Sequence, residues 1–193
     1  MTKEQFTGAM ESALRAISEK KTENTRMLVT LDGPCASGKT TLARSLAEVL
    51  ACDVIHTDDF VVPHSRKTPE RLAIPGGNCE WERLVQEVIA PWKSGAEVLY
   101  RKYDCRADRM KEPEPIRSGD ILILEGSYCN LPAVRGSADV RVFMHTAWEI
   151  RKARLEKRES IRSLQMFYDR WIPLEESYFE AYGLPDRDCI LTC

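Results

Sequence analysis

One segment restricts the fold of this chain more than any other: residues 31–42, with the sequence LDGPCASGKTTL. A short apolar run at 27–31 precedes it and predicts a buried strand. Apolar residues follow it at helical spacing and predict a helix: Leu42, Leu46, Val49 and Leu50. A strand, a glycine-containing loop and a helix in direct succession indicate an α/β domain built on a parallel sheet.

The same segment matches the phosphate-binding loop (P-loop) pattern G-x-x-x-x-G-K-T at every fixed position. Its glycines let successive backbone N–H groups point at an anion, and the helix N-terminus adds its positive dipole end. Lys39 would reach the β- and γ-phosphates of a nucleoside triphosphate, and the Thr40 hydroxyl would ligate Mg²⁺. The alternative, a glycine turn with an unrelated lysine, fits the flanking strand and helix less well. The predicted nucleotide-binding residues are Gly33, Pro34, Cys35, Ala36, Ser37, Gly38, Lys39, Thr40 and Thr41.

The rest of the chain alternates in the same way. Further strands are predicted at 53–57, 97–103, 121–124, 140–145 and 189–192. Further helices are predicted at 4–20, 81–92, 147–159 and 164–182, the last interrupted near Pro173. Such alternation implies a parallel sheet covered by helices. We expect an N-terminal amphipathic helix within residues 1–24, with Phe6, Met10, Leu14 and Ile17 on its apolar face, and a single domain over residues 25–193.

The composition argues against several classes of protein. Lys and Arg number 28 and Asp and Glu 30 among 193 residues, a balance unlike that of a general nucleic-acid-binding protein. No apolar run is long enough to span a bilayer, and Lys3, Glu4 and Glu11 would interrupt the core of a signal peptide. Seven cysteines without C-x-x-C spacing and three scattered histidines favour reduced thiols over a zinc site. We therefore expect a cytoplasmic protein without membrane or nucleic-acid partners.

Carboxylates follow two of the predicted strands. Asp58 and Asp59 come directly after the strand at 53–57, where ligands gather in open α/β sheets. Asp58 could accept the proton of an acceptor hydroxyl and also touch Mg²⁺, with Asp59 as its rival and a turn-capping role as the alternative. Glu125 ends the strand at 121–124, where a single carboxylate can hold Mg²⁺ through water. The expected metal-binding residues are Thr40, Asp58 and Glu125.

Four arginines, Arg151, Arg154, Arg158 and Arg162, lie three or four residues apart, so a continuous helix would carry them as one stripe. Like charges at i, i+4 are unfavourable, and only Arg162 has an acidic partner, Glu159, at helical reach. Such a stripe suits a lid that closes on triphosphate oxygens, and a solvated helix surface is the alternative. Arg151, Arg154 and Arg158 therefore join the predicted nucleotide-binding residues.

Taken in order, these residues resemble a known family, the uridine kinase and phosphoribulokinase family of P-loop kinases. Asp58-Asp59-Phe60 is similar to its Asp-x-Phe-Tyr motif, and the other matches are Tyr103-Asp104, Leu124-Glu125-Gly126 and the arginine-rich helix. The resemblance covers residues 27–191 and is strongest to a bacterial uridine kinase-like branch. It implies a P-loop NTPase fold with a five-stranded parallel sheet in the order 2-3-1-4-5, an Arg-rich lid at about 147–165, and Asp58 as the catalytic base.

The chain departs from the family on the acceptor side. Val61 stands where the family has Tyr, Glu80 follows Asn78-Cys79 where the family has Asn-Phe-Asp, and Cys105 and Asp108 replace an aromatic residue and a histidine. Because these positions shape the nucleoside pocket, the type of reaction carries over better than the substrate does. The predicted substrate-binding residues are Asp59, Glu80, Tyr103, Asp104 and Arg109.

The expected function is Mg²⁺- and ATP-dependent transfer of the γ-phosphate to a hydroxyl of a nucleoside-like acceptor, with uridine or cytidine first. One alternative is a kinase for another sugar-like or phosphorylated metabolite. A second is a non-catalytic ATP-binding regulator, against which Asp58 and Glu125 argue, because a regulator needs no base. The catalytic candidates are Asp58, Lys39 and Arg154. The expected partners are ATP and the small-molecule acceptor, with assembly into a homo-oligomer left open.

Overall fold

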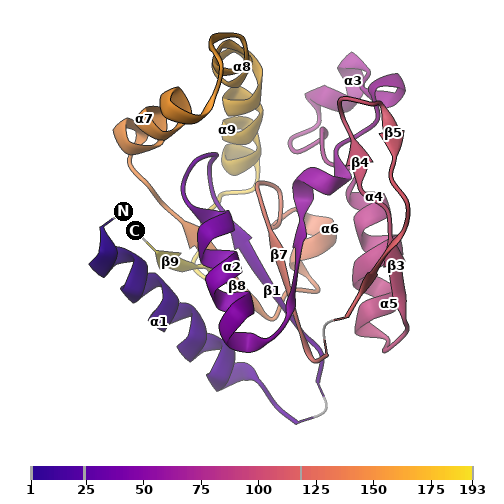
Figure 1. The fold of residues 1–193 in the computed structure, drawn as a ribbon, viewed down its shortest axis with the longest axis vertical. Helices are drawn as coiled ribbons and strands as arrows, with labels where there is room; N and C mark the ends of the chain where they lie inside the picture. Colours follow the sequence, from indigo (N-terminus) through magenta and orange to yellow (C-terminus); the bar gives the residue numbers. More distant parts are fainter. Residues whose placement is uncertain (1, 24, 118, 193) are drawn as a thin grey trace.

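The computed structural model describes residues 2–23, 25–117 and 119–192, and a sheet of five parallel strands forms its centre (Figure 1). Its strands are β1 (Met27–Asp32), β2 (Asp53–His56), β7 (Ile121–Glu125), β8 (Val140–Met144) and β9 (Ile190–Thr192). They lie in the order β2-β7-β1-β8-β9, and in the register Val29 of β1 is opposite both Ile123 and Val140. Numbered along the chain, these strands follow the order 2-3-1-4-5. The fold class and strand order predicted from the sequence are thus confirmed.

Helices cover both faces of the sheet because its central strands are apolar on both sides. Helices α1 (Lys3–Lys20) and α2 (Lys39–Leu50) lie on one face, and α4 (Trp81–Leu84), α5 (Ala90–Lys93) and α6 (Pro132–Arg135) lie on the other (Figure 1). All six residues of β1 are buried. Fully apolar strands of this kind are typical of sheets covered on both faces.

Helix α1 shares its apolar core with α2, β1 and β8. Ala9, Ala13 and Ile17 are its most buried side chains, and Phe6, Met10 and Leu14 are only partly buried beside them. The face predicted from Phe6, Met10, Leu14 and Ile17 packs on this core, with Ala9 and Ala13 as buried residues that the spacing did not name. Side chains as small as alanine let a helix approach its neighbours closely.

Two long helices contain a π-helical stretch. Between α4 and α5 lies η3 (Val85–Ile89), and η4 (Phe167–Trp171) joins α8 (Ile161–Met166) to α9 (Ile172–Ala181). The predicted interruption near Pro173 is therefore a local rewinding within a continuous helix. A proline ring displaces the carbonyl four residues earlier, and for Pro173 that carbonyl belongs to Asp169, inside η4.

The region between α5 and β7 forms small antiparallel ladders beside the central sheet. Strand β3 (Val98–Tyr100) pairs with β6 (Glu114–Ile116), and β4 (Tyr103–Asp104) pairs with β5 (Arg109–Met110). The segment at 97–103, predicted as a strand or extended segment, contains the whole of β3 and the first residue of β4. Three further short helical segments are η1 (Thr57–Phe60), η2 (His64–Arg66) and α3 (Pro69–Ala73).

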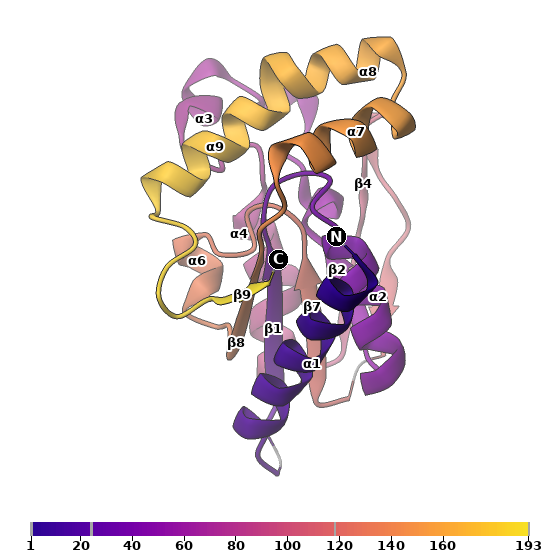
Figure 2. The ribbon, with the colours of Figure 1, turned by 90° about the vertical axis from the view of Figure 1, so that its left-hand side faces the viewer.

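Helix α7 (Trp148–Arg158) and the α8–η4–α9 helix lie together across one end of the sheet, above the loop that joins β1 to α2 (Figure 2). The chain leaves helical geometry at Glu159, and the Ser160 hydroxyl caps α8 by accepting from the Ser163 N–H at 3.2 Å. The predicted continuous stripe from Arg151 to Arg162 is therefore broken before its last member. Within the described ranges, no helix is long and apolar enough to cross a membrane.

Candidate active site

The loop between β1 and α2 has the geometry that its glycines allow. Gly33 has φ +137°, and a Cβ atom there would lie 2.4 Å from the carbonyl oxygen of Met144 in β8. Gly38, with φ +110°, directly precedes the first turn of α2. Lys39 is buried, and its Nζ donates to the carbonyl oxygens of Gly33 at 2.7 Å and Pro34 at 3.0 Å. The lysine ammonium group is thus held over the concave side of the loop, where phosphate oxygens would meet it.

Side chains from the helices above the sheet hold this loop in place. Arg154 of α7 donates from Nη1 to the carbonyl oxygens of Ala36 at 2.7 Å and Ser37 at 3.0 Å. Glu175 of α9 is buried, and one carboxylate oxygen accepts the N–H of Cys35 at 2.9 Å. The second oxygen accepts the hydroxyl of Ser127 at 2.6 Å. The loop is therefore connected to two helices that follow it by more than a hundred residues.

Two cavities meet at the loop and share Ala36, Lys39, Thr40 and Arg158. The smaller one has a volume of about 340 Å³ and is also lined by Asp58, Glu125 and Glu175. The larger one, of about 400 Å³, is also lined by Gly38, Thr41 and Arg154. Each volume is typical of a small-molecule site, so the two together suit a nucleotide and a second small molecule. We call the first the acceptor cavity and the second the nucleotide cavity.

Glu125 lies at the carboxyl end of β7, beside the first turn of α2. It is buried, and one of its oxygens accepts the Thr40 hydroxyl at 3.0 Å and bonds to Nδ1 of His56. This bond is the main cause that raises the pKa of His56 above its ordinary value. Mg²⁺ prefers oxygen ligands and usually takes one or two carboxylates together with substrate phosphates. The hydroxyl of Thr40 and the nearby carboxylates of Glu125 and Asp58 fit this donor set.

Among the described residues, no three or more His, Cys, Asp or Glu side chains form a cluster that could hold a metal by themselves. A magnesium ion at this place would therefore complete its coordination with phosphate oxygens and water. The residues present fit an ion that arrives with the nucleotide.

Asp58 and Asp59 occupy different environments. Asp58 lines the acceptor cavity, whereas Asp59 is absent from the described lining of both cavities. Desolvation is the main cause that raises the pKa of Asp58; Lys39 opposes it, and Glu125 reinforces it. Oδ2 of Asp59 is buried and has no hydrogen-bond partner among the described residues. The two residues lie in the tight helical turn η1.

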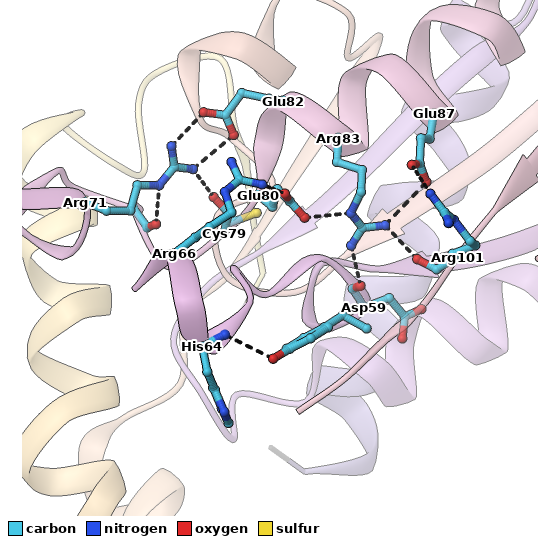
Figure 3. Close-up of polar contacts among 12 residues, drawn as sticks. Asp59, His64, Arg66, Arg71, Cys79, Glu80, Glu82, Arg83, Glu87 and Arg101 are labelled. Carbon is cyan, nitrogen blue, oxygen red and sulfur yellow. Dashed lines mark hydrogen bonds and ion pairs between the residues drawn. The ribbon is translucent and has the colours of Figure 1, made fainter. Parts of the chain in front are cut away.

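The predicted acceptor residues are not gathered in the cavity. Glu80 is buried between two guanidinium groups: Arg83 donates to it at 2.7 Å, and Arg66 bonds to its other oxygen (Figure 3). The Tyr103 hydroxyl contacts Asp108 and accepts the N–H of His64 at 3.1 Å. Neither Glu80 nor Tyr103 is among the described residues that line either cavity.

The two remaining acceptor candidates lie on the β4–β5 hairpin. Asp104 accepts backbone N–H groups of Arg106 at 2.9 Å and Ala107 at 3.1 Å, which is a turn-stabilising role. Arg109 is exposed and lies opposite Asp104 in the hairpin register. The structure therefore brings Asp58 to the cavity and leaves Asp59, Glu80, Tyr103, Asp104 and Arg109 outside its described lining.

The arginines of the lid are divided between different contacts. Arg151 donates from Nε to the carbonyl oxygen of Thr146 at 3.2 Å and from Nη1 to that of Cys35, in the phosphate-binding loop, at 3.4 Å. Arg154 lines the nucleotide cavity and Arg158 lines both cavities. Arg158 also pairs with Glu159 at 2.7 Å. The sequence analysis named Glu159 as the acidic partner of Arg162. This was wrong, because helix α7 ends at Glu159 and the adjacent Arg158 forms the ion pair with it.

The sequence analysis did not name several residues of this site, among them His56, Lys67, Ser127 and Glu175. His56 is the last residue of a predicted strand, and Ser127 follows the Glu125-Gly126 pair, so both occupy strand ends where ligands bind. Lys67 and Glu175 carry no comparable signal. They reach the cavity only because η2 and α9 fold over it.

The comparison with protein families agrees with this geometry. Residues 29–170 match the model of a P-loop family described as an AAA domain. The chain belongs to this family. A search of curated proteins found no sequence that matches the chain.

Several solved structures with the same fold are described as kinases. A possible uridine kinase from Bacillus stearothermophilus is 21% identical, with a TM-score of 0.76, over 98% of this chain and 100% of that one. A protein proposed to be a fructose transport system kinase, from a Silicibacter species, is 21% identical, with a TM-score of 0.73, over 98% of each chain. A D-glycerate 3-kinase from Cryptococcus neoformans is 15% identical, with a TM-score of 0.68, over 96% of this chain and 93% of that one. The fold is that of the P-loop kinases, as the resemblance to the uridine kinase family implied.

Proposed function

We propose that this protein is an ATP-dependent small-molecule kinase that phosphorylates a hydroxyl group. One observation carries the proposal: Lys39 and Thr40 of the phosphate-binding loop line the same cavity as the carboxylates of Asp58 and Glu125. A phosphate-binding lysine, a metal-binding oxygen and a candidate base are the parts that phosphoryl transfer requires. Since ATP and Mg²⁺ are abundant in the cytoplasm, we expect the protein to act there.

The transfer itself needs one proton acceptor. The hydroxyl oxygen of the acceptor forms a bond to the γ-phosphorus, the bond from that phosphorus to the β,γ-bridging oxygen breaks, and ADP leaves with the electron pair. Asp58 takes the hydroxyl proton, and its raised pKa brings it closer to the range in which a base works at neutral pH. Lys39 and Arg154 stabilise phosphate charge. Bound Mg²⁺, held by Thr40, Glu125 and Asp58, would neutralise the triphosphate.

The family resemblance suggests a nucleoside such as uridine or cytidine as acceptor. The carboxylates expected to bind its sugar are, however, already engaged: Glu80 by two arginines and Asp104 by backbone N–H groups. These contacts favour the second candidate, a kinase for another hydroxylated metabolite. The related folds named above include proteins described as acting on uridine, in fructose transport and on glycerate, so the fold is compatible with several acceptors.

The test compares Asp58→Asn with Asp59→Asn, with release of ADP measured over a panel of nucleosides, sugars and hydroxy acids. Asp58→Asn should lower kcat by a factor of about 10²–10⁴, the usual contribution of a positioned base. The affinity for ATP should change little. Asp59→Asn should have a far milder effect, because its side chain lies outside the described cavity lining. Small and equal losses in both variants would contradict the role of Asp58.

A non-catalytic ATP-binding regulator gives a different result in the same assay. It would bind ATP in wild-type and Asp58→Asn protein alike and would release no acceptor-dependent ADP with any compound of the panel.

A further inference from the structure

The acceptor cavity contains a cation without an acidic partner. Lys67 directly follows η2 and lines this cavity together with Trp171 of η4. Its Nζ lies 6.0 Å from the centre of the Trp171 ring. Among the described residues, no carboxylate forms an ion pair or a hydrogen bond with this ammonium group. A partly buried cation of this kind gains from a negatively charged ligand.

The surroundings of Lys67 leave its charge uncompensated. Desolvation is the main cause that lowers the pKa of Lys67, and the nearby charge of Arg170 lowers it further. Cys105 and, more weakly, Asp108 act in the opposite direction. The carboxylate of Asp108 is bonded to the Tyr103 hydroxyl and lies 3.8 Å from Nδ1 of His64. An anion beside Lys67 would offset the desolvation, which Asp108 does only in part.

Lys67 and Asp58 belong to different parts of the cavity wall. The charges that act most on Asp58 are those of Lys39, Glu125 and Glu175, at the phosphate-binding loop. The groups that act on Lys67 lie on the segments that close the cavity from the lid and hairpin sides. One small molecule could therefore meet a carboxylate at one point and an ammonium group at another.

Two of the carboxylates predicted to bind the acceptor are occupied elsewhere. Glu80 is fixed between Arg66 and Arg83 (Figure 3), and Asp104 stabilises its own turn. Neither lines the cavity in the part of the chain that the structure describes. Glu80 and Asp104 therefore cannot bind a ribose diol in this cavity, whereas Lys67 can bind an anion there.

We propose that the acceptor is a small hydroxylated anion, whose phosphate or carboxylate group binds Lys67 while its hydroxyl faces Asp58. The inference rests on the proposed kinase function and specifies its substrate class. The cavity of about 340 Å³ is large enough for a small molecule of this kind. Hydroxy acids and sugar phosphates fulfil these conditions, and unmodified nucleosides do not.

The experiment measures binding by calorimetry, with the enzyme saturated by Mg²⁺ and a non-hydrolysable ATP analogue so that the phosphate-binding loop is filled. The probes are D-glycerate, glycerol 3-phosphate and the neutral control glycerol. We expect one or both anions to bind at least about tenfold more tightly than glycerol, because a hydrogen bond to a charged group contributes about 1.5–3 kcal/mol. The anion that binds better identifies the group as carboxylate or phosphate.

Three variants assign the binding to Lys67. Lys67→Met should remove the preference for anions, and Lys67→Arg should restore most of it. The matched control is Lys111→Met, which removes an exposed lysine outside the described cavity lining and should change nothing. Equal binding of glycerol and both anions, absence of anion binding, or an unchanged preference in Lys67→Met would each overturn the proposal.

The experiments test the kinase function and the anionic acceptor independently of each other. If a neutral acceptor is phosphorylated in an Asp58-dependent way and Lys67→Met retains the activity, the kinase function stands and the anionic acceptor is refuted. If anions bind through Lys67 and no compound is phosphorylated, the site stands and the kinase function is refuted.

Discussion

Replacing Arg83 with methionine tests the network that supports the turn carrying Asp58 (Figure 3). The side chain of Arg83 is only 9% exposed and donates from Nε to Glu80 at 2.7 Å. Its other nitrogens donate to the carbonyl oxygens of Asp59 at 2.9 Å and Arg101 at 2.6 Å. The guanidinium carbon also lies 4.3 Å from the centre of the Phe60 ring.

The magnitude follows from the groups that would lose their donor. Arg83→Met leaves two backbone carbonyls without this donor, and a buried group without a partner costs about 1–3 kcal/mol. It also removes one partner of a buried ion pair, which costs about 3–5 kcal/mol. The two costs overlap, and Glu80 keeps its bond to Arg66. We therefore expect the free energy of unfolding to fall by about 3–5 kcal/mol in total, with a value nearer 3 than 5.

Urea denaturation followed by circular dichroism measures this loss. The matched control is Arg101→Met, because the Arg101 side chain is 49% exposed and its nitrogen lies 3.6 Å from Glu87. Exposed pairs contribute little, so this variant should lose less than about 1 kcal/mol. The double variant Arg83→Met with Glu80→Met should be more stable than Arg83→Met alone, because it also removes the buried Glu80 carboxylate that has lost its bond to Arg83. An Arg83→Met loss no larger than that of Arg101→Met would refute the reasoning.

Two further predictions concern other buried carboxylates. Glu125→Gln should raise the Mg²⁺ concentration needed for half-maximal turnover, because it keeps the shape and removes the charge; an unchanged Mg²⁺ titration would exclude Glu125 from the metal site. Burial is the main cause that raises the pKa of Asp32 from its ordinary value of 3.8 to about 6, so the folded protein retains this proton in a pH range where the unfolded chain has released it. The free energy of unfolding should therefore fall by about 3 kcal/mol as pH rises from about 4 to above 6, and urea titrations of Asp32→Asn should lack this component; identical pH profiles would contradict it.

The central fold could be predicted because its signals are local. The strand at 27–31, the glycine loop and the spacing of Leu42 and Leu46 fix one strand–loop–helix unit, and the structure places β1 and α2 there. The strand order came from the family resemblance, since no spacing within the chain indicates which strands are neighbours. Short ladders such as β4–β5 were not predictable, because two-residue strands show no periodicity.

The candidate site was predictable only where a motif or a strand end marks it. Lys39, Thr40, Asp58 and Glu125 were named in this way. Glu175 was not, because its bond to the Cys35 N–H joins residues 140 positions apart and depends on how α9 crosses the sheet. One residue in the sequence does indicate the break in the arginine stripe: Ser160 is a favourable helix N-cap and therefore predicts the start of a new helix.

The π-helical stretch η4 makes the acceptor cavity sensitive to insertions and deletions. Phe167 and Trp171, at its two ends, both line the cavity. Because a π-helical turn holds one residue more than an α-helical turn, deletion of one residue between them would return the helix to regular winding while α8 and α9 keep their relative orientation. The number of residues before Pro173, as well as their identity, therefore determines the aromatic wall between Phe167 and Trp171. Chains that differ by one residue at this point would present a different wall to their acceptors while keeping the same phosphate-binding loop.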